Sequence, residues 1–184
     1  MKSAFRFPTL IALALVFLGM AHKPPGITVR FFVEANKQDS ETFSTPVTLK
    51  NPPRPAFIEK VPAVSERSFR AIFPFRAADG TWGCAFKLDD QGRLDLDTVS
   101  TSKRGYAIVP LILTKAGRHQ FSEMVIDRPV RDGIISIPNE VTELEIAELR
   151  KLYPVIGESP KTGGKPKKNG GEKTPAPGGF GREE

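Results

Sequence analysis

Four aspartates that lie close together form the densest group of carboxylates in this chain. They are Asp89, Asp90, Asp95 and Asp97. A calcium ion binds several oxygen ligands on a flexible loop, so such a cluster is a candidate ligand set. The spacing lacks the pattern of an EF-hand loop and its terminal glutamate. We therefore interpret these acids as turn-forming and helix-capping residues, and we expect no metal site.

The two histidines, His22 and His119, stand apart from each other in the sequence. If a leader ended at Ala21, His22 would offer its imidazole and a free amine to a copper-type ion. No second ligand accompanies it. His119 falls in a predicted hairpin loop, where we expect it to be solvated. The histidines therefore predict no metal-binding residues.

The candidate nucleophiles lack the partners that would activate them. The segment Ser65-Glu66-Arg67-Ser68 has no G-x-S-x-G elbow, and no histidine is placed as its base, so helix capping is the better interpretation. Cys84 is the only cysteine, which excludes an internal disulfide. It lies on an alternating apolar run, 82–88, where we expect a buried and unreactive thiol.

A short basic segment, Lys103-Arg104-Gly105, has two readings. It could contact a phosphate or the carboxylate of a partner, but an exposed turn is the simpler interpretation. The sequence contains no P-loop, dinucleotide fingerprint, zinc spacing or H-E-x-x-H motif. It therefore predicts no catalytic, cofactor-binding or metal-binding residues, no cofactor and no enzymatic activity. An enzyme with an unrecognised site is kept as an alternative.

The start of the chain has the layout of a secretory signal peptide. Lys2 and Arg6 precede an uninterrupted apolar run, Leu10–Leu18, and Gly19-Met20-Ala21 supplies small residues at the cleavage position. The apolar run is short for a membrane span. We predict a signal peptide at 1–21, cleavage after Ala21, and a location in the periplasm or outside the cell. If the segment is retained instead, it would hold the protein at a membrane.

Composition divides the remaining chain into a body and a tail. Residues 22–157 have the composition of one globular domain, with a strand-rich part at 22–81 and a second part at 82–157. Residues 158–184 are rich in Gly, Pro and Lys, so we predict a disordered tail. The net charge of +6 is spread over leader, body and tail. Because no basic cluster marks the body, we expect no nucleic-acid binding.

Apolar patterns predict a succession of strands. The predicted strands are 28–34, 43–49, 56–61, 81–88, 106–113, 120–127 and 134–137. Pro46 predicts an edge position for the second of these strands, and Pro110 predicts an edge or a bulge in the fifth. Phe32 points to the polar side of its strand, which indicates either a contact patch or a second buried layer.

Two helices are predicted and one segment is left open. Ser65 as N-cap, with Val64 stapled onto Phe69, predicts a short helix that ends at Pro74. Thr142 and Glu145 form a capping box for a helix that ends at Pro154, with Val141 and Ile146 as the hydrophobic staple. Residues 89–104 fit a helix capped by Asp89 or Asp90 and a strand about equally well.

Phenylalanines are expected to supply most of the core. The candidates, together with Trp82, are Phe31, Phe57, Phe69, Phe73, Phe75 and Phe86.

The second half of the body resembles the head subdomain in the large periplasmic domain of SecD, a membrane subunit of the bacterial protein-export machinery. The matching residues occur in the same order and with similar spacing over about 82–156. They are Phe86-Lys87-Leu88-Asp89, Gly92, Gly105, Met124-Val125-Ile126, Pro129-Val130, Asp132-Gly133-Ile134-Ile135-Ser136-Ile137, Thr142-Glu143-Leu144-Glu145-Ile146, Leu149-Arg150 and Pro154.

The resemblance implies an α+β domain with antiparallel strands, helices packed on one face, and the order β-α-β-β-β-α in its second half. It also favours a helix at 90–102. Residues 22–81 do not match, no membrane span is predicted after the leader, and Lys151-Leu152-Tyr153 stands where SecD has a glycine. The resemblance therefore implies a fold and a kind of partner, not export activity.

From sequence we expect an exported, non-catalytic module that binds another protein or an envelope component. The alternative is a structural role in which the basic tail tethers the protein to anionic envelope polymers.

Overall fold

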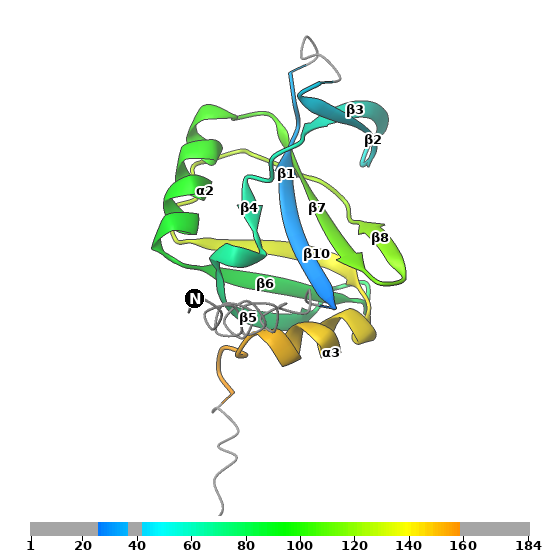
Figure 1. Ribbon diagram of the computed structural model, residues 1–184, viewed down its shortest axis with the longest axis vertical. Helices are drawn as coiled ribbons and strands as arrows, with labels where there is room; N and C mark the ends of the chain where they lie inside the picture. The colour runs from blue at the N-terminus through cyan, green and yellow to red at the C-terminus, as the bar shows by residue number, and fades with distance from the viewer. Residues whose placement is uncertain (1–25, 37–41, 159–184) are drawn as a thin grey trace, which may run out of the picture.

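The computed structural model describes residues 26–36 and 42–158. The predicted leader and the predicted tail beyond residue 158 lie outside the described residues. Most of the described chain is antiparallel sheet with two α-helices, which confirms the α+β class (Figure 1).

The strands form three antiparallel groups. The first sheet joins β4 (Val64–Ser65), β1 (Ile27–Val33), β7 (Ala107–Thr114) and β8 (Gly117–Gln120) in that order, with β9 (Met124–Val125) also pairing with β7. The second sheet has the order β10 (Ile134–Val141), β6 (Trp82–Leu88), β5 (Phe69–Arg76). The third is a hairpin of β2 (Ser44–Lys50) and β3 (Pro53–Glu59).

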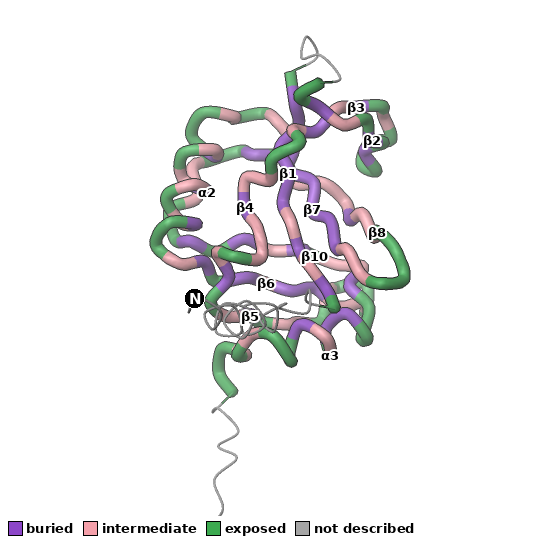
Figure 2. The backbone as a smooth tube through the Cα atoms, in the orientation of Figure 1, coloured by how far each residue is buried: buried purple, intermediate pink, exposed green. Residues whose placement is uncertain are grey.

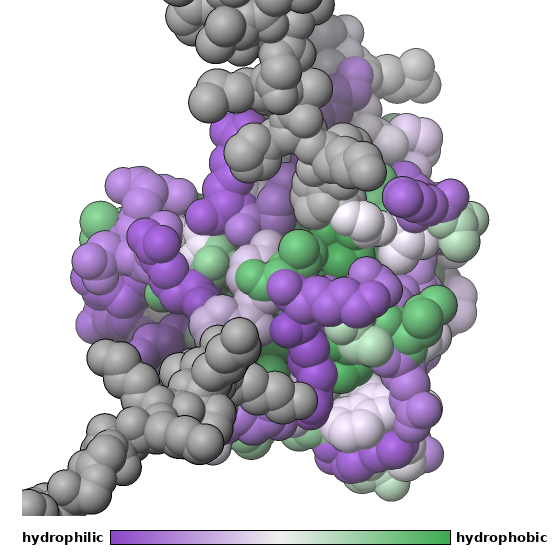
Figure 3. Space-filling model, turned by 60° about the horizontal axis from the view of Figure 1, so that its bottom comes forward, coloured by the Kyte–Doolittle hydropathy of each residue, from purple (hydrophilic) through white to green (hydrophobic). Residues whose placement is uncertain are grey.

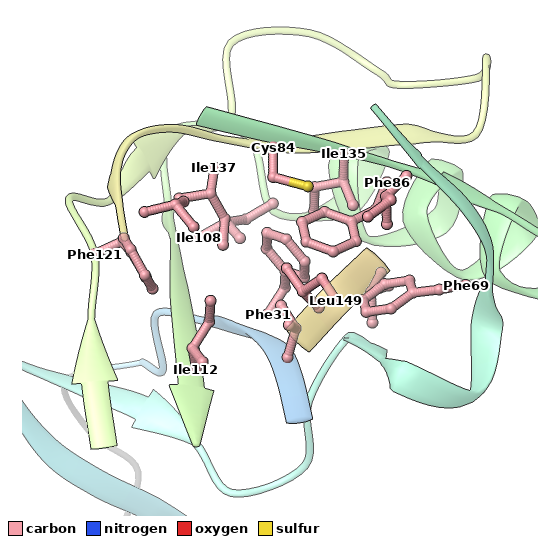
Figure 4. Packing of buried hydrophobic residues seen from close by; sticks show 14 of the residues in the cluster. Phe31, Phe69, Cys84, Phe86, Ile108, Ile112, Phe121, Ile135, Ile137 and Leu149 are labelled. Carbon is pink, nitrogen blue, oxygen red and sulfur yellow. The ribbon is translucent and has the colours of Figure 1, made fainter. Parts of the chain in front are cut away.

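The main core lies between the first two sheets. Phe31 and Ile112 from the first sheet meet Cys84 and Phe86 from the second, and Leu149 of α3 (Glu143–Leu152) closes one side (Figure 4). Phe31 contacts Phe86 edge to face, with ring centroids 5.8 Å apart. In Figure 2 the buried residues are concentrated on β1, β6 and β7, strands that line this core.

The hairpin forms a second apolar layer over the outer face of the first sheet. Its members are Phe32, Val47, Leu49, Ala56, Ile58, Ala107, Val109 and Leu111. Phe32 is 9% exposed, so the second buried layer is correct and the contact patch is not. Glu34 holds the hairpin by accepting two hydrogen bonds from Arg54, at 2.7 and 2.8 Å, and one from the backbone N–H of Ala107.

The predicted helix that starts at Ser65 is wrong. Ser65 ends β4, Glu66–Ser68 form a single 3₁₀ turn, and β5 begins at Phe69. A bulge between Phe69 and Ala71 adds Arg70 to the strand, so Phe69 and Ile72 both face the core although they are three residues apart. This spacing imitates the period of a helix.

Both remaining helices have the predicted caps. Asp89 precedes α2 (Asp90–Ser102) and accepts a hydrogen bond from the backbone N–H of Gly92 at 2.8 Å. Thr142 and Glu145 form the complete capping box of α3. The open segment 89–104 is therefore mainly helical, as the resemblance favoured.

The predicted strand 120–127 is interrupted. The chain leaves β8 at Gln120 and rejoins β7 only at Met124, so Pro110 lies between two separate pairings of β7. Its missing N–H thus falls where no neighbouring strand needs it. Pro46 lies in β2, a strand that pairs on one side only, as predicted.

The aromatic core is smaller than predicted. Phe31, Phe69 and Phe86 are buried, and Phe121 joins them. Phe73 is 48% exposed, while Phe57 and Phe75 are only partly buried. Phe73 and Phe75 share the outer face of β5, because alternate residues of a strand point to opposite faces and Ile72 faces the core.

Candidate protein-interaction site

The four clustered aspartates do not converge on a common point. Asp89 caps α2, Asp95 accepts a hydrogen bond from Gln91, and Asp97 lies 3.6 Å from Arg131. Among the residues at 26–36 and 42–158, no group of three acidic, histidine or cysteine side chains is arranged to hold a metal ion.

His119 is not solvated in a loop, contrary to the sequence-based expectation. It lies on β8, stacks against Phe121 with ring centroids 4.0 Å apart, and places Nδ1 3.0 Å from Oε1 of Glu145. Glu145 is buried, and its other oxygen accepts hydrogen bonds from the N–H and hydroxyl of Thr142. His119 therefore joins β8 to the start of α3. His22 lies outside the described residues.

The candidate nucleophiles remain without activating partners. Cys84 is fully buried, and burial raises the pKa of its thiol to about 12, so the reactive thiolate is suppressed. Ser65 precedes the 3₁₀ turn without forming a side-chain cap. Ser68 packs against Gly92, where an added Cβ would lie 2.6 Å from the Ser68 Cβ.

The basic segment at 103–105 makes contacts within the protein. Lys103 forms an ion pair with Glu59 at 2.9 Å and lies over the ring of Tyr106. Arg104 donates a hydrogen bond to the backbone carbonyl of Asp127. These contacts tie the end of α2 to the hairpin and to the chain after β9.

A cavity of about 210 Å³ opens where the margins of the two large sheets meet, and we call it the edge groove. Its lining residues are Leu96, Ser100, Ile108, Met124, Val125, Ile126, Asp127, Arg128, Val130, Ile134, Ile135 and Ser136. Apolar side chains from α2, β7, β9 and β10 form most of its surface. Val125 is 63% exposed and Ile134 is 45% exposed, so apolar surface extends out of the groove.

Both strands at the groove have unpaired main-chain groups. Gly133 accepts a hydrogen bond from Leu88 of β6, so by alternation the N–H and C=O of Ser136 point away from β6. Ile126 accepts the N–H of Gly105 and donates its own N–H to the carbonyl of Tyr106. By the same alternation, the N–H and C=O of Val125 point away from β7. Within the described part of the chain, neither residue has a main-chain partner on its outer side.

Polar side chains at and beside the groove are few, and those of Ser100 and Asp132 already make hydrogen bonds. The hydroxyl of Ser100 donates to the carbonyl of Asp97 and accepts the N–H of Val130 at 2.8 Å. Asp132 accepts the N–H of Ile134. Arg128 lines the groove, exposed and without an ion pair among the described residues.

Exposed or partly exposed apolar side chains also lie on the outer face of the second sheet, the face to which Ile134 belongs. Phe73 is paired with Ala85, and Phe75 with Gly83, so small residues on β6 lie beside large ones on β5. An added Cβ at Gly83 would lie 2.5 Å from the ring of Phe75. Figure 3 shows the face that includes the bottom of Figure 1, where hydrophobic residues gather in the middle and hydrophilic ones border them.

Sequence reasoning did not find the edge groove. Its residues come from four separate elements, and each apolar run by itself is typical of a core strand. The available signal was Val125 and Ile134, since each lies at the end of an alternating run where one side of the strand must face solvent.

Comparisons with known proteins give similar solved structures but no family. No family model matches the chain, and no curated protein matches it. A solved structure described as "Structure and function of a membrane component SecDF that enhances protein export" has a TM-score of 0.45 and 12% identity, covering 81% of this chain and 69% of that one. Another, described as "Crystal structure of SecDF in Super-membrane-facing form", has a TM-score of 0.46 and 10% identity, covering 81% of this chain and 21% of that one. Within residues 26–36 and 42–158, no helix has the length and hydropathy to cross a membrane.

Proposed function

We propose that this chain is an exported, non-catalytic binding module that holds a polypeptide partner at the edge groove. The observation that carries the proposal is the combination, at one place, of an apolar cavity with the open main-chain margins of two strands. An apolar cavity contributes burial energy, and open margins offer hydrogen bonds that a polypeptide backbone can match.

The chemistry of the groove supports binding rather than catalysis. Ser100, the buried hydroxyl in its wall, already makes two hydrogen bonds. A nucleophile needs a base within hydrogen-bond reach, and no carboxylate in the described part of the chain, Asp127 included, is hydrogen-bonded to this hydroxyl. The buried thiol of Cys84 does not line the groove.

The predicted leader supports a location outside the cytoplasm. The apolar run Leu10–Leu18 and the small residues at Gly19-Met20-Ala21 are typical of exported proteins. A module exported without a catalytic site needs partners in the envelope or beyond it. The mature N-terminus, determined by mass spectrometry of protein from its native envelope, tests this step, and cleavage after Ala21 is the expected result.

A pull-down with paired variants tests the binding role. The mature protein is crosslinked in native envelope, and the captured polypeptides are compared with those of Val125→Glu and Val61→Glu. Both valines are exposed, at 63% and 75%, but only Val125 lines the groove. We expect Val125→Glu to lose the captured partner and Val61→Glu to retain it. Equal capture by both variants would place binding elsewhere.

A further inference from the structure

We infer that the partner binds as an added β-strand along the edge of β10, with an apolar side chain in the edge groove and an acidic side chain beside Arg128. This inference rests on the proposed function and specifies the partner chemistry: an extended peptide segment in which apolar and acidic residues alternate with small polar ones. Its basis is the pattern of satisfied and open groups along the margins of the second sheet.

The two margins of that sheet differ. The outer side of β5 is covered by the chain after α3, since Ile72 donates to the carbonyl of Pro154 and accepts from the N–H of Ile156, at 3.0 and 2.8 Å. On β10, the C=O of Ile134 and both main-chain groups of Ser136 point outward without partners in the described residues. An extended backbone is the ligand that matches alternating N–H and C=O groups.

The length of the open margin is limited to a few residues. The N–H of Ile134 is taken by Asp132 at 3.0 Å, Pro138 has no N–H, and a bulge interrupts pairing between Ile137 and Val141. Such features are typical of edge strands that avoid unspecific sheet extension. The open part is centred on Ser136, which also lines the groove. Strand pairing and cavity filling therefore occur at the same place.

The groove selects side chains by size and charge. Side chains alternate between the two faces of an added strand. If one peptide side chain points toward Met124 and Ile135 in the groove, the side chain two positions later in the peptide lies on the same face. Arg128 is the base in the lining and Asp127 is the acid, and Arg128 forms no ion pair within residues 26–36 and 42–158. An acidic residue near Arg128 would gain a charge-assisted hydrogen bond.

A second copy of the chain fits this margin less well. Antiparallel self-pairing centred on Ser136 would place Ile134 opposite Pro138 of the other copy, and proline cannot donate to the Ile134 carbonyl. Two copies paired in this way therefore form only the two hydrogen bonds between their Ser136 residues. A foreign peptide without proline can also donate an N–H to the carbonyl of Ile134.

Binding of a fluorescent heptapeptide, Lys-Thr-Val-Thr-Val-Thr-Glu, to the full mature chain tests the inference by anisotropy. Peptides that carry a single N-methyl group at each backbone position in turn form the critical series. Each lost hydrogen bond is expected to weaken binding about fivefold. The inference predicts that alternate positions are sensitive and that the positions between them are not.

Two protein variants accompany the peptides. Ser136→Pro removes the N–H from the margin, as Pro138 already does two residues later, whereas Ser136→Ala keeps it and changes only the side chain. We expect weaker binding for Ser136→Pro alone, with circular dichroism confirming that it is folded. Should it unfold, the N-methyl series still decides the question.

The outcomes separate the inference from the proposed function. If N-methylation at every position leaves peptide binding unchanged, whereas Val125→Glu abolishes it, strand addition is overturned and the binding role is kept. No binding of the peptide to the wild-type chain, with no partner captured in the envelope, would overturn both. A dimer that separates in Ser136→Pro would identify a second copy as the occupant and overturn the peptide proposal.

Discussion

Val125 and Ser136 lie at the margins of two different sheets and line the same cavity, each with its main-chain N–H and C=O turned away from its own sheet. Among the strands of the described residues, none therefore closes over the apolar side chains between these margins. This combination of an apolar cavity and open main-chain groups is the basis for the proposal that an extended polypeptide binds here.

Gly83 is expected to be intolerant of a side chain. In Gly83→Ala the new Cβ would lie 2.5 Å from the Phe75 ring and from the carbonyl oxygen of Pro138, so overpacking should lower the free energy of unfolding by about 1–3 kcal/mol. Gly26→Ala, whose new Cβ would lie 3.9 Å from Oε2 of Glu148, is the control in denaturant unfolding. Equal stability of the two variants would show that the outer face of the second sheet is more open than described.

Removal of the α3 cap is expected to cost about 1 kcal/mol. Thr142→Ala deletes the hydroxyl that accepts the N–H of Glu145 and donates to its carboxylate. Thr142→Ser retains that hydroxyl and should unfold at nearly the wild-type denaturant concentration. A cost for the serine variant as large as that for alanine would mean that the threonine methyl group, not the cap, supplies the stability.

Cys84 is expected to resist thiol reagents in the folded protein at pH 8. Burial raises its pKa from the ordinary 9.0 to about 12, so folding favours the protonated thiol. The resulting stability is fully present below pH 9 and is lost as the pH rises toward 12. The difference in unfolding free energy between wild type and Cys84→Ala should therefore shrink over that interval. Rapid labelling under native conditions would contradict the burial and reopen a nucleophilic role.

Glu66 is expected to make the protein sensitive to acid. Burial alone would raise the pKa of Glu66, but hydrogen bonds and charge attraction from Arg30 outweigh it and lower the pKa. A lowered pKa contributes stability above the ordinary value of 4.5, and this stability is lost as the pH falls through the folded-state pKa. Unfolding of wild type and Glu66→Gln at a series of pH values should converge in acid. Curves that stay parallel throughout would show that the Arg30 pair contributes nothing measurable.

Local chemistry made several elements predictable. The capping box of Thr142 and Glu145 and the alternation in β1 depend on residues within one turn or one strand, so the sequence displays them directly. The sequence of α2 fits a helix and a strand about equally well, because Gly92 and many Ser and Thr residues weaken its helical pattern, and only the resemblance favours the helix.

Non-local contacts account for the errors. The bulge at Arg70 gives β5 a helical spacing of apolar residues, and its pairing with β6 fixes it as a strand. His119 gains its position from Glu145, 26 residues away in sequence. The edge groove depends on how two sheets meet, which no single segment encodes.

Amide hydrogen exchange at Ser136 tests whether a peptide pairs with β10, because the N–H of Ser136 points away from β6 at the groove. Exchange is measured by NMR on the labelled mature chain with and without the heptapeptide Lys-Thr-Val-Thr-Val-Thr-Glu. We predict that exchange at Ser136 slows on addition of the peptide. Exchange at Val61, which is exposed but does not line the groove, should be unchanged. Unchanged exchange at Ser136 in a sample where the peptide is bound would contradict this prediction.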